Sequence, residues 1–123
     1  MTDGVSAALR AQEQVVIYEE KVQQFRKNNL FELCQALGVN PLLSTECLIA
    51  DCREICGSMI MELSEHEDIE GKEVNVVRVK LKDYWSAEEF RDFNLRTSLL
   101  RAYVFLVWTE SELGKKAIKK ALG

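Results

Sequence analysis

Residues 6–27 carry the hydrophobic pattern of one long amphipathic helix. No glycine or proline interrupts residues 6–27, and apolar side chains recur there at steps of three and four. The positions on this stripe are Val15, Tyr18, Val22 and Phe25. Glutamate and glutamine occupy the opposite side, so the pattern predicts one buried face and one solvated face. We take the stripe as a candidate interface, because a second chain would cover it if its own chain does not.

Two shorter helices are predicted next from their capping residues. Asn29 and Glu32 resemble a capping box in front of the segment LFELCQAL. Gly38 suits the position just after that helix, where a left-handed backbone is common. Ser44 or Thr45 then caps a third helix.

The end of this third helix has two interpretations. Gly57 could stop it, which would leave residues 58–64 as a strand because apolar positions alternate there. Alternatively, the helix could continue through Gly57 to Ser64, at a cost of about 1 kcal/mol relative to alanine. Helical spacing of the apolar residues persists as far as residue 63, so the pattern favours the helix.

A strand is predicted over residues 77–82, where apolar and basic residues alternate. Its apolar side consists of Val77, Val79 and Leu81, and its basic side consists of Arg78, Lys80 and Lys82. Val74 and Val76 are out of phase with this alternation, which predicts a bulge near residues 76–77. The backbone groups of a strand need partners. Either residues 58–64 pair with it as a hairpin, or a copy from another subunit does.

The segment WSAEEF predicts the start of a long central helix. Ser86 and Glu89 fit a capping box, and Trp85 and Phe90 fit the hydrophobic staple around it. Apolar residues then follow at helical spacing as far as residue 107, with Phe93 on the same stripe as Phe90.

Thr109 and Glu112 fit a further capping box, which predicts a last helix near the C-terminus. Its apolar side would place Leu113, Ala117 and Leu122 against the body of the protein. Four lysines of this helix remain for solvent, near the end where positive charge is favourable. They are Lys115, Lys116, Lys119 and Lys120.

These elements predict a mostly α fold: a single-domain helical bundle of about four or five helices with one short β-strand or hairpin. The length suits one globular domain over residues 1–123, and 47% hydrophobic with 29% charged residues is typical of a folded protein. The first residues lack the pattern of a signal peptide, and the longest apolar stretch, residues 99–108, is too short to cross a bilayer. We expect a cytoplasmic protein without a membrane partner.

Charge is distributed unevenly along the chain, whose net charge is −4. Residues 1–70 contain thirteen acidic and five basic residues, a net charge of −8. Residues 71–123 contain seven acidic and eleven basic residues, a net charge of +4. This asymmetry predicts that the two halves attract each other, within one molecule or between two.

The residue types that usually carry catalysis or metal binding follow no recognised motif in this sequence. Cys34, Cys47, Cys52 and Cys56 lack the paired spacing of zinc sites, and the lone histidine, His66, lies ten residues beyond the last of them. The sequence also lacks a phosphate-binding glycine loop and the common nucleophile motifs. We predict reduced cysteines that pack as small apolar residues, no cofactor, no metal site and no catalytic residue.

Two charged stretches are candidates for binding. The acidic stretch forms either a solvated loop or a site for a basic protein surface, and it contains Glu65, Glu67, Asp68 and Glu70. The basic side of the strand at 77–82 is either solvated or a contact surface for nucleic-acid phosphates.

We interpret the sequence as a non-enzymatic, small protein–protein interaction module that docks a partner protein and forms a homodimer. Adaptors and modulators encoded by phages or mobile elements are often of this kind. The candidate partner-binding residues are Val15, Tyr18, Val22, Phe25, Glu65, Glu67, Asp68 and Glu70. The alternative is a nucleic-acid-binding accessory protein that uses Arg78, Lys80 and Lys82. A small enzyme of unknown reaction is the third interpretation.

Overall fold

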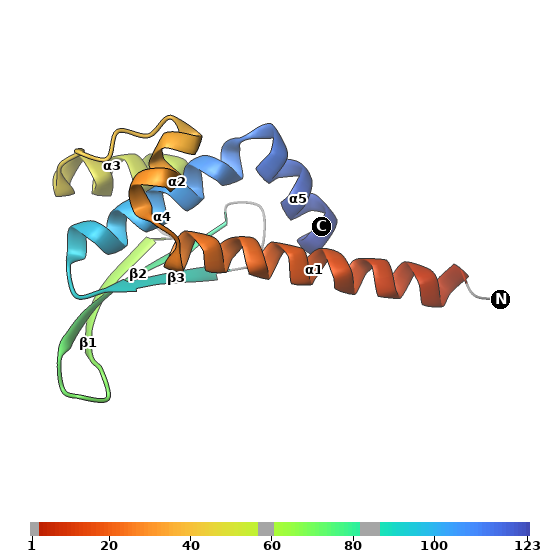
Figure 1. Cartoon of the computed structure of the whole chain (residues 1–123), viewed down its shortest axis with the longest axis horizontal. Coiled ribbons are helices and arrows are strands. Elements are labelled where there is room, and N and C mark those ends of the chain that lie inside the picture. Colours follow the sequence, from red (N-terminus) through yellow and green to blue (C-terminus); the bar gives the residue numbers. More distant parts are fainter. Residues whose placement is uncertain (1–2, 57–60, 82–86) are drawn as a thin grey trace.

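The computed structural model describes residues 3–56, 61–81 and 87–123. These residues form five helices and one three-stranded antiparallel sheet (Figure 1). In chain order the elements are α1 (Asp3–Lys27), α2 (Leu30–Leu37), α3 (Thr45–Cys56), β1 (Met61–Glu67), β2 (Glu73–Lys80), β3 (Ala87–Asp92), α4 (Leu95–Glu110) and α5 (Glu112–Leu122). The mostly α class is therefore correct, but the β part has three strands instead of a single strand or hairpin.

The sheet has the strand order β1–β2–β3, and its inner face is covered by helices. Val77 in the middle strand pairs with Leu63 of β1 and with Phe90 of β3. Val77, Val79 and Leu81 are buried, so the predicted apolar side of this strand does face the core. Helix α4 lies against β2 and β3, while α2 and α3 pack on α4 from another side.

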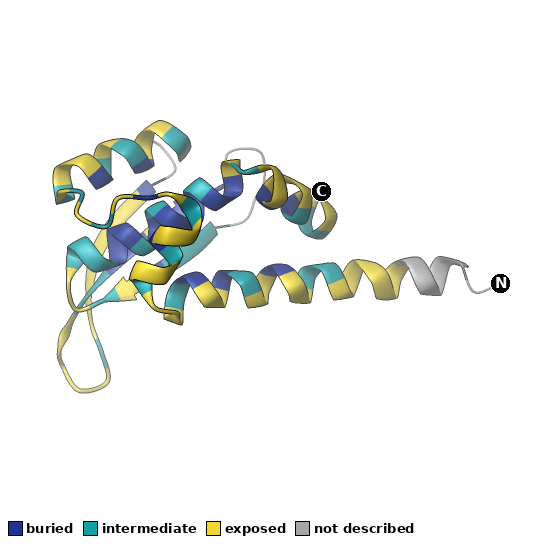
Figure 2. Ribbon diagram, turned by 45° about the horizontal axis from the view of Figure 1, so that its top comes forward, coloured by how far each residue is buried: buried dark blue, intermediate teal, exposed yellow. Residues whose placement is uncertain are grey.

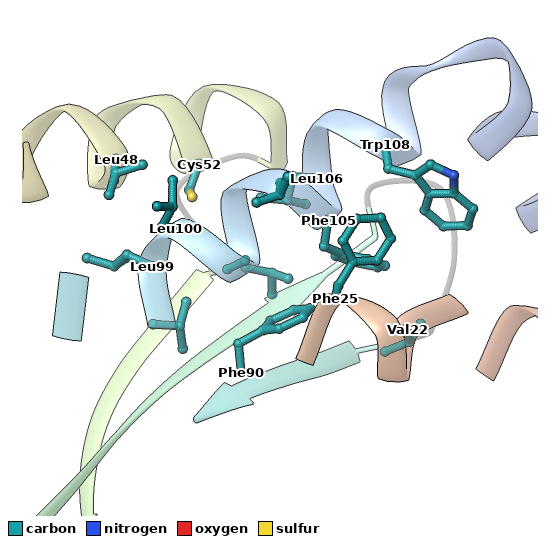
Figure 3. Packing of buried hydrophobic residues seen from close by; sticks show 14 of the residues in the cluster. Val22, Phe25, Leu48, Cys52, Phe90, Leu99, Leu100, Phe105, Leu106 and Trp108 are labelled. Carbon is teal, nitrogen blue, oxygen red and sulfur yellow. The ribbon is translucent and has the colours of Figure 1, made fainter. Parts of the chain in front are cut away.

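Aromatic side chains from three elements meet at the centre of the core (Figure 3). The ring centroid of Phe105 in α4 lies 5.8 Å from that of Phe25 in α1 and 5.3 Å from that of Phe90 in β3. Trp108, one turn further along α4, lies 5.5 Å from Phe25. Offset aromatic pairs at such distances contribute about 0.5–1.5 kcal/mol each beyond the area that they bury.

The predicted caps of α2 and α3 are confirmed. The Asn29 side chain accepts a hydrogen bond from the Glu32 amide at 3.1 Å, and Gly38 ends α2 in the left-handed conformation with φ 68°. The Ser44 hydroxyl accepts a hydrogen bond from the Cys47 amide at 3.2 Å. Each of these signals needs only residues close in sequence, because a cap satisfies backbone groups of its own helix.

The favoured helix through residues 58–64 is wrong for its second half. Residues 61–64 belong to β1, which pairs with β2 inside the same chain, whereas residues 57–60 lie outside the described residues. Pairing satisfies the backbone of both strands and places Met61 in the core, which outweighs the helical spacing. The predicted bulge is also wrong, because the described register is continuous on both sides of β2. Val76 is buried on the outer face between its neighbours Ser64 and Arg91.

The long helix does not start at WSAEEF. Residues 87–92 form strand β3, and α4 begins only at Leu95, where the Asn94 side chain accepts a hydrogen bond from the Thr97 amide at 3.2 Å. The proposed cap at Ser86 and the aromatic residue before it lie outside the described residues. Pairing with β2 satisfies the backbone of this segment and buries Phe90. This pairing between residues distant in sequence therefore outweighs the local preference for a helix start.

The cap of α5 also lies elsewhere than predicted. The Ser111 hydroxyl accepts from the Gly114 amide at 3.1 Å, while the Thr109 hydroxyl donates to the Leu106 carbonyl at 2.6 Å inside α4. Because α5 starts at this later point, it turns Ile118 into the core and leaves Leu113 78% exposed. Leu113 was predicted to face the body, and that prediction is wrong.

Two phenylalanines distinguish the predicted helix from the observed strand. On a helix Phe90 and Phe93 would share one buried stripe, whereas here Phe90 is fully buried and Phe93 is 64% exposed. We expect Phe90→Ala to lower the free energy of unfolding by about 3–5 kcal/mol, because it opens a cavity beside Phe105. Phe93→Ala should change that free energy by less than about 1 kcal/mol. Urea unfolding followed by circular dichroism measures both values, and equal losses would contradict strand β3.

Candidate docking surface

The apolar stripe predicted on α1 is mostly covered by the protein itself. Tyr18, Val22 and Phe25 are buried, and only Val15 is half-buried. The Tyr18 ring stacks on Trp108 with centroids 6.5 Å apart. These three buried residues are therefore not exposed for docking in this conformation, because α4 and α5 already occupy their face.

Polar contacts fasten the same stretch of α1 to strand β3. The Tyr18 hydroxyl donates to one oxygen of the Glu88 carboxylate at 3.0 Å, and Arg26 forms an ion pair with the other oxygen at 3.0 Å. Arg26 also donates to the Glu89 carbonyl at 2.8 Å. This last bond occupies a backbone acceptor on the outer edge of the sheet, so α1 protects that edge.

A different part of α1 leaves apolar side chains in solvent. Leu9, Val16 and Ile17 are each about half exposed or more, and Leu113 of α5 is also largely exposed. Between α1 and α5 runs a groove of about 310 Å³, whose apolar lining includes Ile17, Trp108, Leu113 and Ala117. We call these six residues, Leu9, Val16, Ile17, Trp108, Leu113 and Ala117, the α1–α5 surface.

The N-terminal part of α1 extends beyond the body of the protein (Figure 2). Residues 8–13 are all exposed, and six consecutive helical residues point in every direction around the axis. No side of the helix is therefore covered along this stretch, which we call the overhang. Burial begins only at residues 14 and 15, where the helix reaches the rest of the protein.

Charged residues lie beside the groove on both helices, and Glu20 and Lys21 of α1 belong to its lining. On α1, Glu13 and Glu20 lie four residues before and three after Ile17, which places them on the same side of the helix. On α5, Lys116 and Lys120 lie three and seven residues after Leu113, which places them on the same side of that helix. All four charged side chains are exposed, and within the described ranges no ion pair joins the two walls.

The sequence could have indicated part of this surface. Residues 15–17 are three consecutive apolar residues, and on a helix they span about 200° of the circumference. A stripe that buries Tyr18 and Val22 cannot also bury both Val16 and Ile17. Exposure of Leu113 depends on where α5 begins, so no pattern in the sequence reveals it.

The acidic stretch forms the tip of the β1–β2 hairpin. Glu65 and Glu67 are exposed on β1, whereas Asp68 builds the turn by accepting the amides of Glu70 and Lys72 at 2.9 and 2.8 Å. Glu70 lies 3.6 Å from the Lys72 ammonium. Part of this stretch is therefore strand and not loop, and the carboxylate of Asp68 serves the turn.

The basic side of β2 is interrupted by carboxylates. Arg78 forms an ion pair with Glu62 on β1 at 3.6 Å and pairs in register with Glu89 on β3. Lys80 is half-buried, and Lys82 lies outside the described residues. A phosphate backbone that approached Arg78 would meet both glutamates, which disfavours nucleic-acid binding at this face.

The described thiols differ in exposure. Cys34 and Cys52 are fully buried and Cys47 is exposed, while the side chain of Cys56 lies outside the described residues. Burial raises the pKa of the Cys34 thiol, and the Arg96 guanidinium offsets this only in part. Burial likewise raises the pKa of the Tyr103 hydroxyl. The His66 ring lies 3.1 Å from the Ser64 hydroxyl, and no three potential metal ligands cluster in the described part of the chain.

We expect a thiol reagent to distinguish these cysteines. In the native protein iodoacetamide should modify Cys47 at least about 100-fold faster than Cys34 or Cys52, because a buried thiol reacts only after the structure opens. Peptide mass spectrometry over a time course measures the three rates. Comparable rates in buffer, with equal rates in denaturant as the reference, would show that Cys34 and Cys52 are not in a closed core.

Comparisons with known proteins add no functional assignment to this geometry. Within the described residues no helix is both long and apolar enough to span a membrane. The chain matches no family model, no curated protein and no solved structure.

Proposed function

We propose that the protein is a non-enzymatic protein–protein interaction module that docks an amphipathic helix on the α1–α5 surface. The observation that supports this proposal is the groove between α1 and α5, which is lined by Trp108, by Ile17 at 51% exposure and by Leu113 at 78% exposure. Burying apolar surface contributes about 25 cal/mol per Å², so a partner that covers these side chains gains free energy of binding from them.

The shape and chemistry of the surface suit a helix. Leu9 and Val16 lie two turns apart in one row along α1, and Ile17 points about 100° away from Val16, into the groove. A partner helix with its own stripe at helical spacing matches the row of Leu9 and Val16. Lys21 also lines the groove and adds a positive charge on the α1 side, with its ammonium 5.9 Å from the centroid of the Trp108 ring. A helix with apolar residues at the centre of its stripe and charged residues at the margins would satisfy both features.

The alternative function, nucleic-acid binding by the basic side of β2, has less support. Glu62 and Glu89 flank Arg78 on both neighbouring strands. The Arg78 guanidinium therefore already has a carboxylate partner on the sheet, and a phosphate would have to compete with that partner.

A display library of helical peptides tests the proposed function with many candidate partner sequences at once. Selection on the immobilised protein should enrich peptides with apolar residues at i, i+3, i+4 and i+7. Leu113→Asp should then weaken the selected peptides at least about tenfold, the effect of losing roughly 1.4 kcal/mol of apolar burial.

The matched control is Leu42→Asp, since Leu42 is equally exposed at 79% but lies between α2 and α3. Circular dichroism should show both variants folded. Peptides without an apolar stripe, or an equal loss of affinity in the control variant, would contradict docking on the α1–α5 surface.

A further inference from the structure

We propose that the helix docked on the α1–α5 surface is α1 of a second copy of this chain, so that two chains form a two-fold symmetric dimer. This inference rests on the proposed function, because it names the partner of the same surface. It requires the surface to be self-complementary, since a two-fold interface brings each patch against its own copy.

The charges of the two walls meet that requirement. On α1, Glu13 and Glu20 form an acidic row between Ile17 and Val16, whereas Lys21 lies inside the groove. On α5, Lys116 and Lys120 lie on the side of Leu113. When α1 of one copy lies against α5 of the other, and the reverse holds by symmetry, each acidic wall faces a basic wall. Complementary charges of this kind select the partner and fix its orientation.

The uneven distribution of charge between the two halves of the chain also supports association with a second copy. Part of the predicted attraction is used inside the molecule, where Arg78 pairs with Glu62 and Lys72 with Glu70. Arginines of α4 are also engaged, by neutral carbonyls of the N-terminal half. Arg101 donates to the Phe25 and Asn28 carbonyls at 3.1 and 2.9 Å, and Arg96 donates to the carbonyls of Pro41 and Leu43. The exposed lysines of α5 take part in no ion pair within the described residues. They therefore remain available for acids of a second chain.

The overhang supplies a second reason. Residues 8–13 form helix although no side of that helix is covered. In proteins most helical stability comes from the packing of an amphipathic face. A stable interface also buries roughly 800 Å² per partner, which requires contacts beyond the groove itself. The overhang of one copy, laid along the α1–α5 surface of the other, would add contact area and receive the cover that its own chain does not provide.

The mass of the protein in solution tests this inference directly. Light scattering after size exclusion, at roughly 50 μM loaded protein, should give twice the chain mass of 14.1 kDa. Ile17→Glu and Leu113→Glu should each shift the protein to the monomer. Ile69→Glu and Leu42→Glu, at apolar positions outside the surface that are at least as exposed, should leave the dimer intact. All four variants should unfold cooperatively.

A charge-reversal experiment tests which walls meet. Glu13→Lys/Glu20→Lys makes both walls basic, and Lys116→Glu/Lys120→Glu makes both walls acidic, so each variant alone should dimerise at least about tenfold more weakly. An equimolar mixture should restore the dimer as a heterodimer, because every acidic wall then faces a basic one. Native mass spectrometry distinguishes the heterodimer if one variant carries a heavy-isotope label.

The two proposals fail in different ways. A wild-type chain that stays monomeric up to about 100 μM, while selected helical peptides still bind and lose affinity in Leu113→Glu, would overturn the second copy as partner and leave the docking function standing. A dimer that persists in Leu113→Glu, or a charge-reversed mixture that does not associate, would also overturn this inference. Selected peptides without an apolar stripe, or an equal loss of peptide affinity in the Leu42 and Leu113 variants, would overturn the proposed function itself.

Discussion

The packing of Phe105 determines how the rest of the structure is arranged. Its ring touches Phe25 of α1 on one side and Phe90 of β3 on the other, so one residue of α4 joins the long helix to the edge of the sheet. Burial of three aromatic rings at one point contributes several kcal/mol, a large fraction of the stability of a domain of this size. Because this contact lies near the C-terminal end of α1, it fixes the helix where Val22 and Phe25 are buried and leaves the first half to extend outward. The overhang follows from where the aromatic contact holds the helix.

The corner between α4 and α5 produces the other wall of the groove. Gly114 sits so close to the Trp108 carbonyl that a Cβ atom there would lie 1.8 Å from the oxygen. Glycine therefore allows α5 to turn sharply after Ser111, and the hydroxyl of Ser111 caps the new helix. The sharp turn returns α5 across α1, with Ile118 buried and Leu113 outside. A wider turn would carry α5 away from α1, and the groove would not form. Core packing and exposed surface thus depend on the same few residues.

The parts of the fold that sequence analysis predicts well are those determined by near neighbours in the chain. Asn29, Gly38 and Ser44 act on backbone groups within four residues, so their roles follow from residue type and spacing. The segment containing Phe90 shows the limit of this reasoning. Its local pattern fits a helix start, but β2 offers hydrogen bonds and a buried site beside Val77 that only the folded chain supplies. The same competition between the local helical pattern and strand pairing determines the structure of residues 61–64. Once β2 is known to be a central strand, both neighbours become necessary, because its backbone must be paired on two sides.

For the candidate site, periodicity finds the helix but not which of its faces stays open. The stripe through Tyr18 and Phe25 is the strongest apolar signal on α1, and for that reason the protein's own core takes it. The weaker signal of Val16 and Ile17, beside that stripe, is what remains at the surface. The strongest apolar stripe is buried within the chain because intramolecular contacts form at a high effective concentration, with which a separate partner has to compete. A docking surface on such a helix is then formed by the margin of the stripe, where apolar side chains alternate with charges. Apolar burial at that margin supplies affinity, and the glutamates and lysines around it determine which partner, and which orientation, is accepted.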